Sequence, residues 1–166
     1  MNDRPAEHAI RAALLDSAAD LLTYFERRVG LDDAPDLLGD LMATAWRRAS
    51  SLPPSPEEAR MWLFGIARHT LNNATRTERR HSHLLQRLRD ITTRTVAPAS
   101  DVGLEVRDAV GRLNEDDAEL IRLVHWDGFS IEAAAELIGT PASTARSRYQ
   151  RAKATLRAAL SPSVGE

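Results

Sequence analysis

The chain has 166 residues, 43% of them hydrophobic and 28% charged, which indicates one folded domain or two small ones and excludes disorder throughout. It has no cysteine, so disulfides and thiolate metal sites are excluded. This composition fits a protein of the reducing cytosol. The N-terminus lacks the segments of a signal peptide, and no apolar run approaches the roughly 20 residues that span a bilayer. We therefore expect a cytoplasmic protein without membrane insertion.

The charge is unevenly distributed, although the whole sequence carries only −2. Residues 1–59 hold 6 basic and 11 acidic residues, whereas residues 60–94 hold 8 arginines and 2 acids. Residues 101–139 hold 3 basic and 10 acidic residues, and residues 140–160 hold 5 basic residues and no acid. Two basic blocks alternate with two acidic ones, which favours a protein that meets DNA with some surfaces and a protein with others.

Two helices are predicted at the start of the chain. Apolar residues recur at helical spacing over residues 6–29, and Gly30 ends that helix. Asp33 and Pro35 open a second helix with a broad apolar face, where we expect Trp46 to belong to the core. The residues of this face are Leu37, Leu38, Leu41, Met42, Ala45, Trp46 and Ala49.

A third helix follows a stiff loop. Three prolines between Leu52 and Pro56 forbid helix there, and Ser55 and Pro56 start a helix that should reach about Arg80. Its first half is apolar and its second half is rich in arginine. Trp62 has two possible roles, stacking on DNA or packing in the core, and its apolar neighbours favour the core.

The second half of the chain begins after a break in periodicity. Small and polar residues from about Asp90 to Asp101 indicate a linker. A helix from about 102 to 113 follows, and Asn114 caps the next one. With no strand pattern and no repeat, we predict an all-α fold of two small helical domains joined by a flexible linker. The predicted boundaries are residues 1–89, a linker over 90–101, and residues 102–166.

The clearest local signal is a helix-turn-helix over residues 127–160. Ser130 can cap a short helix, and Gly139 can take the left-handed conformation that ends it. We expect Thr140 to cap the next helix, with Pro141 at its first position. That helix is basic, as a recognition helix entering the major groove requires. Its basic residues are Arg146, Arg148, Arg151, Lys153 and Arg157.

Two stretches of the first domain resemble region 2 of the extracytoplasmic-function (ECF) sigma factors of bacterial RNA polymerase. The run from Asp36 to Arg48 resembles the family's acidic-Leu-x-Gln-Glu-x-Phe-x-x-x-Trp-Arg helix, and Trp62 to Arg68 resembles its Trp-Leu-Tyr-x-Ile-Ala-Arg helix. The first run departs from the pattern, because Gly39-Asp40 stands where the family has Gln-Glu. Glycine inside a helix costs roughly 1 kcal/mol relative to alanine. The departure bears on polymerase affinity, because the family grips polymerase with that helix.

The second domain resembles region 4 of the same family. Leu113-Asn114-Glu115 matches the Leu-Pro-Glu opening of that region, and the run from Phe129 to Lys153 matches its helix-turn-helix closely. The resemblance covers nearly the whole chain. It implies a sigma factor that binds core polymerase, recognises −35 and −10 promoter elements and assists duplex opening.

For the −35 element, the resemblance points to the recognition helix. Arginine pairs bidentately with guanine and glutamine with adenine, each worth about 1–3 kcal/mol of discrimination. We expect four residues at base edges (Arg146, Ser147, Gln150 and Arg151), while Arg148, Lys153 and Ser143 favour phosphate, with exchanges between the two sets left open. The full −35 set is Ser143, Thr144, Arg146, Ser147, Arg148, Gln150, Arg151 and Lys153. The alternative is a solvated helix face.

For the −10 element, the resemblance points to the third helix and the loop of about residues 50–55 before it, where the family captures an unstacked base. Binding such a base shifts the equilibrium toward the open duplex. The candidate residues are Arg60, Arg68, His69, Asn72, Asn73, Arg76, Arg79 and Arg80.

For polymerase, the resemblance points to the second helix. The candidates are Leu37, Leu38, Asp40, Leu41 and Arg48, and the alternative for the leucines is packing within the domain. The implied partners are core RNA polymerase (the clamp of its largest subunit and the flap of its second-largest), promoter DNA and an anti-sigma factor.

We expect that the protein is not an enzyme and that it has no cofactor and no metal site. No catalytic motif stands out, His81-Ser82-His83 lacks a nearby acid, and Asp116-Asp117 has the character of a pair of helix-start acids. Two rival functions stay open. One is a helix-turn-helix regulator that does not deliver polymerase, and the other is a helical adaptor whose arginines stay solvated. The adaptor predicts no salt-dependent DNA binding.

Overall fold

The computed structural model describes residues 4–85 and 101–161, with side chains over 5–77 and 103–161. Within those ranges the chain forms seven α-helices, one short 3₁₀ helix and no strand, so the all-α prediction is confirmed. The chain divides into two compact units, Met1–Val96 and Ala97–Glu166. The predicted linker falls on residues 90–101, of which all but the last lie outside the described part.

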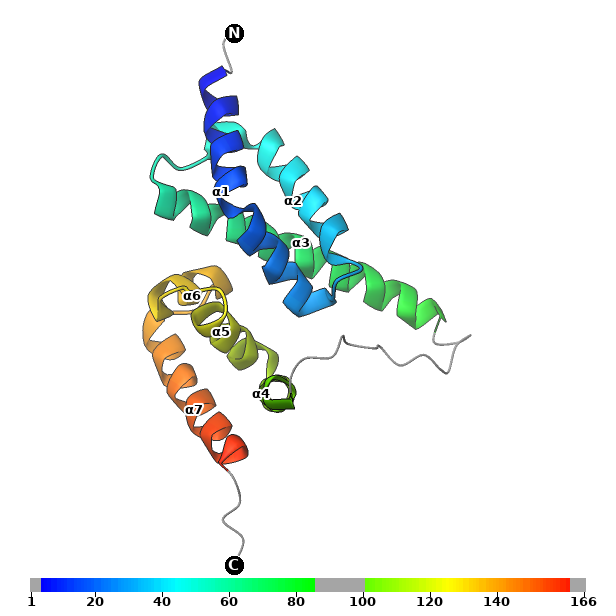
Figure 1. Ribbon diagram of the computed structural model, residues 1–166, viewed down its shortest axis with the longest axis vertical. Helices are drawn as coiled ribbons and strands as arrows, with labels where there is room; N and C mark the ends of the chain where they lie inside the picture. The colour runs from blue at the N-terminus through cyan, green and yellow to red at the C-terminus, as the bar shows by residue number, and fades with distance from the viewer. Residues whose placement is uncertain (1–3, 86–100, 162–166) are drawn as a thin grey trace, which may run out of the picture. The chain divides into compact units, whose positions relative to one another are not determined.

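Unit 1 is a three-helix unit in which every helix packs against the other two (Figure 1). Its elements are α1 (Arg4–Val29), α2 (Ala34–Arg47), the 3₁₀ helix η1 (Ala49–Ser51) and α3 (Pro56–Leu85). Tyr24 is at the centre of its core, with edge-on contacts of 5.4 Å between ring centroids to both Phe25 and Phe64. The fully buried side chains around it include Ile10, Leu21, Leu41 and Leu63.

The helix ends of unit 1 follow the sequence signals. Gly30 has a φ of +93°, and its N–H still donates to the carbonyl of Glu26. Ser55 caps α3, because its hydroxyl accepts from the N–H of Glu58 at 3.2 Å. Asp33 precedes α2 without a side-chain capping bond. The third helix runs five residues beyond the predicted Arg80, to Leu85.

The prediction that Trp46 belongs to the core is wrong. The inward stripe of α2 is Ala34, Leu37, Leu41 and Ala45, whose spacing of three and four residues keeps them on one side. Trp46 lies one residue further, about 100° around the helix. Its side chain is therefore 47% exposed.

Unit 2 consists of α4 (Asp101–Gly111), α5 (Glu115–His125), α6 (Ile131–Ile138) and α7 (Ala142–Leu160). The last helix packs against the other three. The buried residues of α6 and α7, which pack against each other, include Ala134, Ala135 and Ala145, and small side chains of this kind let helices approach closely. Larger side chains, Leu120, Leu123 and Val110, fill the rest of the core.

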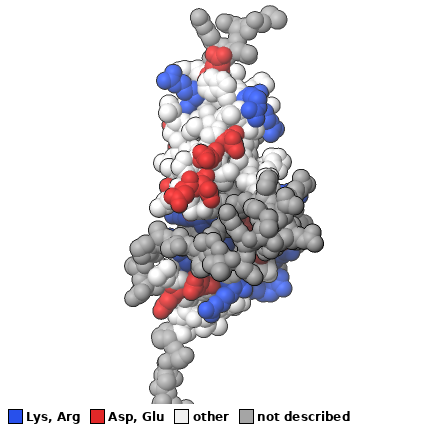
Figure 2. All heavy atoms as spheres, turned by 90° about the vertical axis from the view of Figure 1, so that its right-hand side faces the viewer, with Lys and Arg blue, Asp and Glu red and all other residues white. Residues whose placement is uncertain are grey.

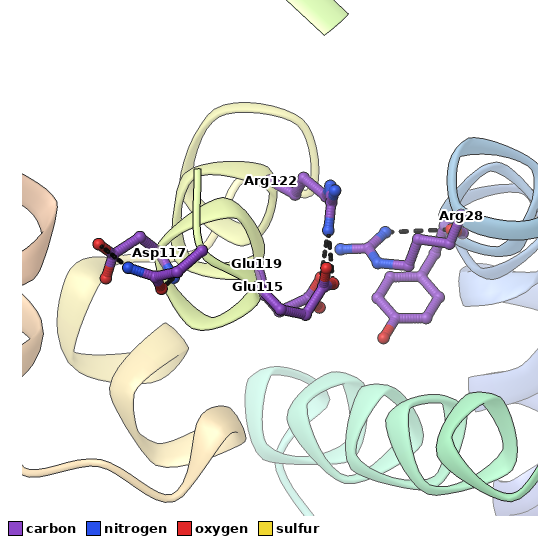
Figure 3. Close-up of polar contacts among 7 residues, drawn as sticks. Arg28, Glu115, Asp117, Glu119 and Arg122 are labelled. Carbon is purple, nitrogen blue, oxygen red and sulfur yellow. Dashed lines mark hydrogen bonds and ion pairs between the residues drawn. The ribbon is translucent and has the colours of Figure 1, made fainter. Parts of the chain in front are cut away.

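Two capping predictions in unit 2 are confirmed. The side-chain oxygen of Asn114 accepts from the N–H of Asp117 at 2.9 Å, and the hydroxyl of Ser130 accepts from Ala133 at 3.1 Å. Figure 3 shows Asp117 in this cap and Arg122 directed at two carboxylates of its own helix, Glu115 at 3.0 Å and Glu119 at 3.5 Å. The charges of α5 are thus partly satisfied within the helix.

The turn between α6 and α7 differs in one detail from the prediction. Gly139 is left-handed, with φ +69°, as expected. Thr140 is not the cap of α7, because that helix begins one residue later than predicted. The N–H of Thr140 donates to the carbonyl of Ala135 and closes α6 in a Schellman motif. Pro141 occupies the N-cap, since its ψ of 139° is not helical, and α7 begins at Ala142.

In the described part of the chain, no helix combines the length and apolar character that a membrane span requires.

Candidate nucleic-acid interface

The helix α7 has one buried and one exposed face. Ala145, Tyr149 and Ala152 are buried at spacings of four and three residues. The opposite face is made of small, polar and basic residues, all of them exposed. They are Ser143, Thr144, Ser147, Gln150 and Arg151. The structure therefore brings three of the four predicted base-edge residues onto one accessible surface.

Two arginines border this exposed face on opposite edges. At about 100° per residue, Arg146 and Arg148 lie about 200° apart around α7. Arg146 reaches α6, where its Nε and Nη2 donate to the same oxygen of Glu132, Oε1, at 3.1 and 2.7 Å. Arg148 reaches α5, where its Nη1 lies 3.0 Å from Oδ2 of Asp116. Each arginine is therefore oriented by an acid from another helix.

The pair at Glu132 also has an electrostatic effect. The hydrogen bonds from Arg146 lower the pKa of the Glu132 carboxyl, and a bond from its own backbone N–H acts in the same direction. The carboxylate therefore stays ionised at neutral pH. Both side chains remain more than half exposed, 57% for Arg146 and 55% for Glu132, so the pair is open to a ligand.

Lys153 lies beside the buried face rather than at the centre of the exposed one. Its Nζ is 5.3 Å from the ring centroid of Tyr149. The Tyr149 hydroxyl lies 2.9 Å from Nε2 of His125, and the two rings stack. Tyr149 thus connects the recognition helix to the end of α5.

A groove of about 530 Å³ separates the start of α5 from α7. Its walls carry both signs of charge, with Asp116 and Asp117 facing Arg148 and Arg151. Arg151 therefore belongs both to the groove and to the exposed face of α7.

On α3, five of the predicted −10 residues share one face. Arg68, His69, Asn72, Asn73 and Arg76 span about 140° of arc at about 100° per residue, opposite the buried Leu63 and Ala67. Within this arc Nδ2 of Asn73 lies 3.0 Å from Nε2 of His69. The side chains of Arg79 and Arg80 lie outside the described residues.

Arg60 lies outside that arc. Its Nη2 is 3.3 Å from Oδ2 of Asp20 on α1, and its guanidinium carbon is 4.6 Å from the ring centroid of Phe64. These contacts connect α3 to α1 within unit 1.

The predicted polymerase residues of α2 separate into two groups. Leu37 and Leu41 are buried in the core of unit 1, whereas Leu38 is half-buried and Asp40 is exposed. Arg48 is exposed, with its guanidinium carbon 5.8 Å from the ring centroid of the half-buried Trp62. Figure 2, which views unit 1 from the side where α2 lies in Figure 1, shows acidic and basic side chains in separate clusters.

Family comparisons agree with this layout. The model of sigma-70 region 2 matches residues 14–81, and the model of sigma-70 region 4 matches residues 103–156. The chain is 31% identical over 132 residues to the ECF RNA polymerase sigma factor EcfG of Rhodopseudomonas palustris, covering 78% of this chain and 72% of that protein. It is 26% identical over 161 residues to the ECF RNA polymerase sigma factor SigL of Mycobacterium tuberculosis, covering 93% and 91%.

The chain belongs to the ECF sigma factors.

Solved structures of sigma factors share its fold. The sigma factor RpoE of Bartonella quintana, crystallised with the anti-sigma factor NepR, matches with a TM-score of 0.71 and 27% identity, over 92% of this chain and 97% of that chain. CnrH, solved with the cytosolic domain of CnrY, matches with a TM-score of 0.64 and 23% identity, over 92% and 88%. The family makes this protein a promoter-recognising transcription initiation factor.

Sequence reasoning about this ECF sigma factor missed the two acids that border α7. The sequence pattern places Asp116 among the acids that start its helix and gives no signal at Glu132. They are 32 and 14 residues from the arginines they contact. The one available signal was the helix-turn-helix, which brings the first turn of α6 beside α7.

The described residues contain no group of three or more His, Asp or Glu side chains placed to hold a metal ion. The side chains of His81 and His83 lie outside the part of the chain that this statement covers.

Proposed function

We propose that this ECF sigma factor divides promoter recognition between its two units. In unit 2, the exposed face of α7 reads the −35 element in the major groove. In unit 1, the polar face of α3 binds the unpaired −10 strand. The polar face is made of Arg68, His69, Asn72, Asn73 and Arg76, with Arg79 and Arg80 extending it along the sequence.

The observation that carries the proposal is the composition of α7. Its buried stripe fixes the helix, and its opposite face presents Ser147, Gln150 and Arg151 between two oriented arginines. Long polar side chains and arginines in this arrangement suit base edges, with a phosphate contact at the border formed by Arg148. Arg60 is left out of the −10 set, because it is engaged with Asp20 and Phe64 inside unit 1.

Polymerase binding is assigned to the outer side of α2. Leu38, Asp40 and Arg48 stay in this set, whereas Leu37 and Leu41 contribute to the core. Met42 and Trp46 continue the outer stripe at spacings of four residues from Leu38. An anti-sigma factor is the second protein partner we propose, by similarity to the structure of RpoE with NepR. The role needs no covalent chemistry, and polymerase acts in the cytoplasm.

A regulator that binds DNA without delivering polymerase is less well supported. Such a protein needs only the second unit, whereas region 2 matches residues 14–81 of this chain.

The test separates duplex binding from duplex opening. Full-length protein and core RNA polymerase are bound to a promoter that they transcribe, and opening is measured by permanganate reactivity of unpaired thymines. Gln150→Ala should weaken duplex binding by about 1–3 kcal/mol and leave the opening of bound complexes unchanged. The double variant Asn72→Ala, Asn73→Ala should bind the duplex normally and open it poorly.

Each variant is the control for the other. The division of labour is contradicted if both variants impair the same step, or if neither changes either step.

A further inference from the structure

The guanidinium of Arg146 is held side-on by Glu132. Both Nε and Nη2 donate to one oxygen, Oε1, so the contact uses the side edge of the guanidinium. Arginine has five N–H donors in a planar fork. The side-on contact leaves the other edge, formed by Nη1 and the second N–H of Nη2, directed away from Glu132. That end-on edge carries two parallel N–H donors, so it can pair bidentately with O6 and N7 of guanine.

We propose that Glu132 is a specificity-determining residue of −35 recognition, which positions Arg146 so that its end-on edge meets one guanine. The inference rests on the proposed function, because it needs α7 in the major groove. Glu132 acts through Arg146 and is a positioning residue. The partner it selects is a guanine at a single base-pair position of the −35 element.

Stability alone gives a weak reason for the pair. Both side chains are more than half exposed, and exposed ion pairs contribute little to folding. A carboxylate at the edge of a DNA-binding face also opposes phosphate and so lowers affinity. Glu132 therefore lowers the affinity for DNA and adds little stability. Its presence on this face has a physical reason if it restricts the rotamers of Arg146.

The opposite edge of α7 supplies a matched control. Arg148 makes a contact of the same kind with Asp116, through Nη1 alone at 3.0 Å. Asp116→Asn and Glu132→Gln remove one negative charge each from the same unit. Arg148 is assigned to phosphate, so releasing it should change affinity without changing base preference.

The experiment selects DNA from a pool of randomised duplexes with the full-length protein bound to core RNA polymerase. The wild type should select a −35 motif with guanine at one position. Glu132→Gln should lower the guanine preference there by about fivefold or more, the lower end of what one bidentate arginine supplies. It should also raise total affinity and steepen the salt dependence, because one acid near phosphate is gone. Asp116→Asn should raise affinity with every base preference unchanged.

Three further variants separate positioning from charge and from folding. Glu132→Asp keeps the charge and shortens the side chain, so it should lose the guanine preference as Glu132→Gln does. If the glutamine variant does not fold, the aspartate variant tests the positioning role in its place. In an Arg146→Ala background, Glu132→Gln should no longer alter any base preference. Thermal unfolding of each variant should match that of its parent closely.

Several results would overturn the inference. They are an unchanged motif in Glu132→Gln, an even loss of affinity for all sequences, the same change of preference in Asp116→Asn, and full preference in Glu132→Asp. A wild-type protein that selects no motif at all contradicts the proposed function itself, and the inference falls with it.

Discussion

At the residue scale, Gly139 shows how one position fixes the turn of the recognition motif. Its φ of +69° lies in the left-handed region, which costs other L-residues roughly 1–2 kcal/mol. An added Cβ would meet nothing within 4 Å, so the requirement for glycine is conformational and not a matter of space. The two backbone bonds that close α6 depend on this conformation.

Replacing Gly139 with alanine should therefore lower the free energy of unfolding of unit 2 by about 1–2 kcal/mol. Gly65→Ala is the matched control, because Gly65 is helical, exposed and equally free of neighbours around a Cβ. It should raise the free energy of unfolding by up to about 1 kcal/mol. Urea unfolding of the full chain measures both. If the two substitutions change the free energy of unfolding equally, the left-handed conformation at residue 139 does not require glycine.

Single residues also mark the limit of what the sequence could predict. Asn114, Ser130 and Gly139 act through neighbours a few positions away, so their roles follow from local pattern. Glu132 and Asp116 act across helices, and their partners depend on how α5 and α6 cross α7. A one-dimensional pattern contains no such crossing geometry. The failure at Thr140 has a local cause, since Pro141 keeps a non-helical ψ of 139° and α7 therefore begins only at Ala142.

At the element scale, α2 carries two adjacent stripes. The inner one, with Leu41 fully buried, belongs to the core. The outer one, Leu38, Met42 and Trp46, runs from half-buried to 47% exposed. The sequence predicts a broad apolar face on α2, with more residues than one buried stripe needs. It does not tell which of these residues point into the core. Only the packing of α1 and α3 decides that.

This separation predicts different effects for two alanine substitutions in one helix. Leu41→Ala should cost about 2–5 kcal/mol of stability, because it opens a cavity in the core. Trp46→Ala should leave stability within about 1 kcal/mol and weaken binding to core polymerase. Thermal unfolding and a polymerase-binding titration measure the two effects. If Trp46→Ala destabilises the protein and binds polymerase normally, the outer stripe is not a docking surface.

At the scale of the whole molecule, the alternating charge blocks have two roles. The acidic block over residues 101–139 supplies Glu132 and Asp116, which pair with arginines of the basic block that follows it. The basic block over residues 60–94 supplies the arginines of α3. A net charge of −2 therefore coexists with two basic faces, and the charge of the chain as a whole says little about DNA binding.

The central claim is that this ECF sigma factor directs polymerase to promoters by reading two elements. The most direct test is transcription of a genomic DNA library by purified core RNA polymerase, with and without the protein, followed by mapping of the new RNA 5′ ends. The account predicts new start sites that share two upstream motifs. It also predicts that Gln150→Ala removes a base preference only in the −35 motif and leaves the −10 motif unchanged. Polymerase that binds the protein and yet starts at no new site would contradict the claim.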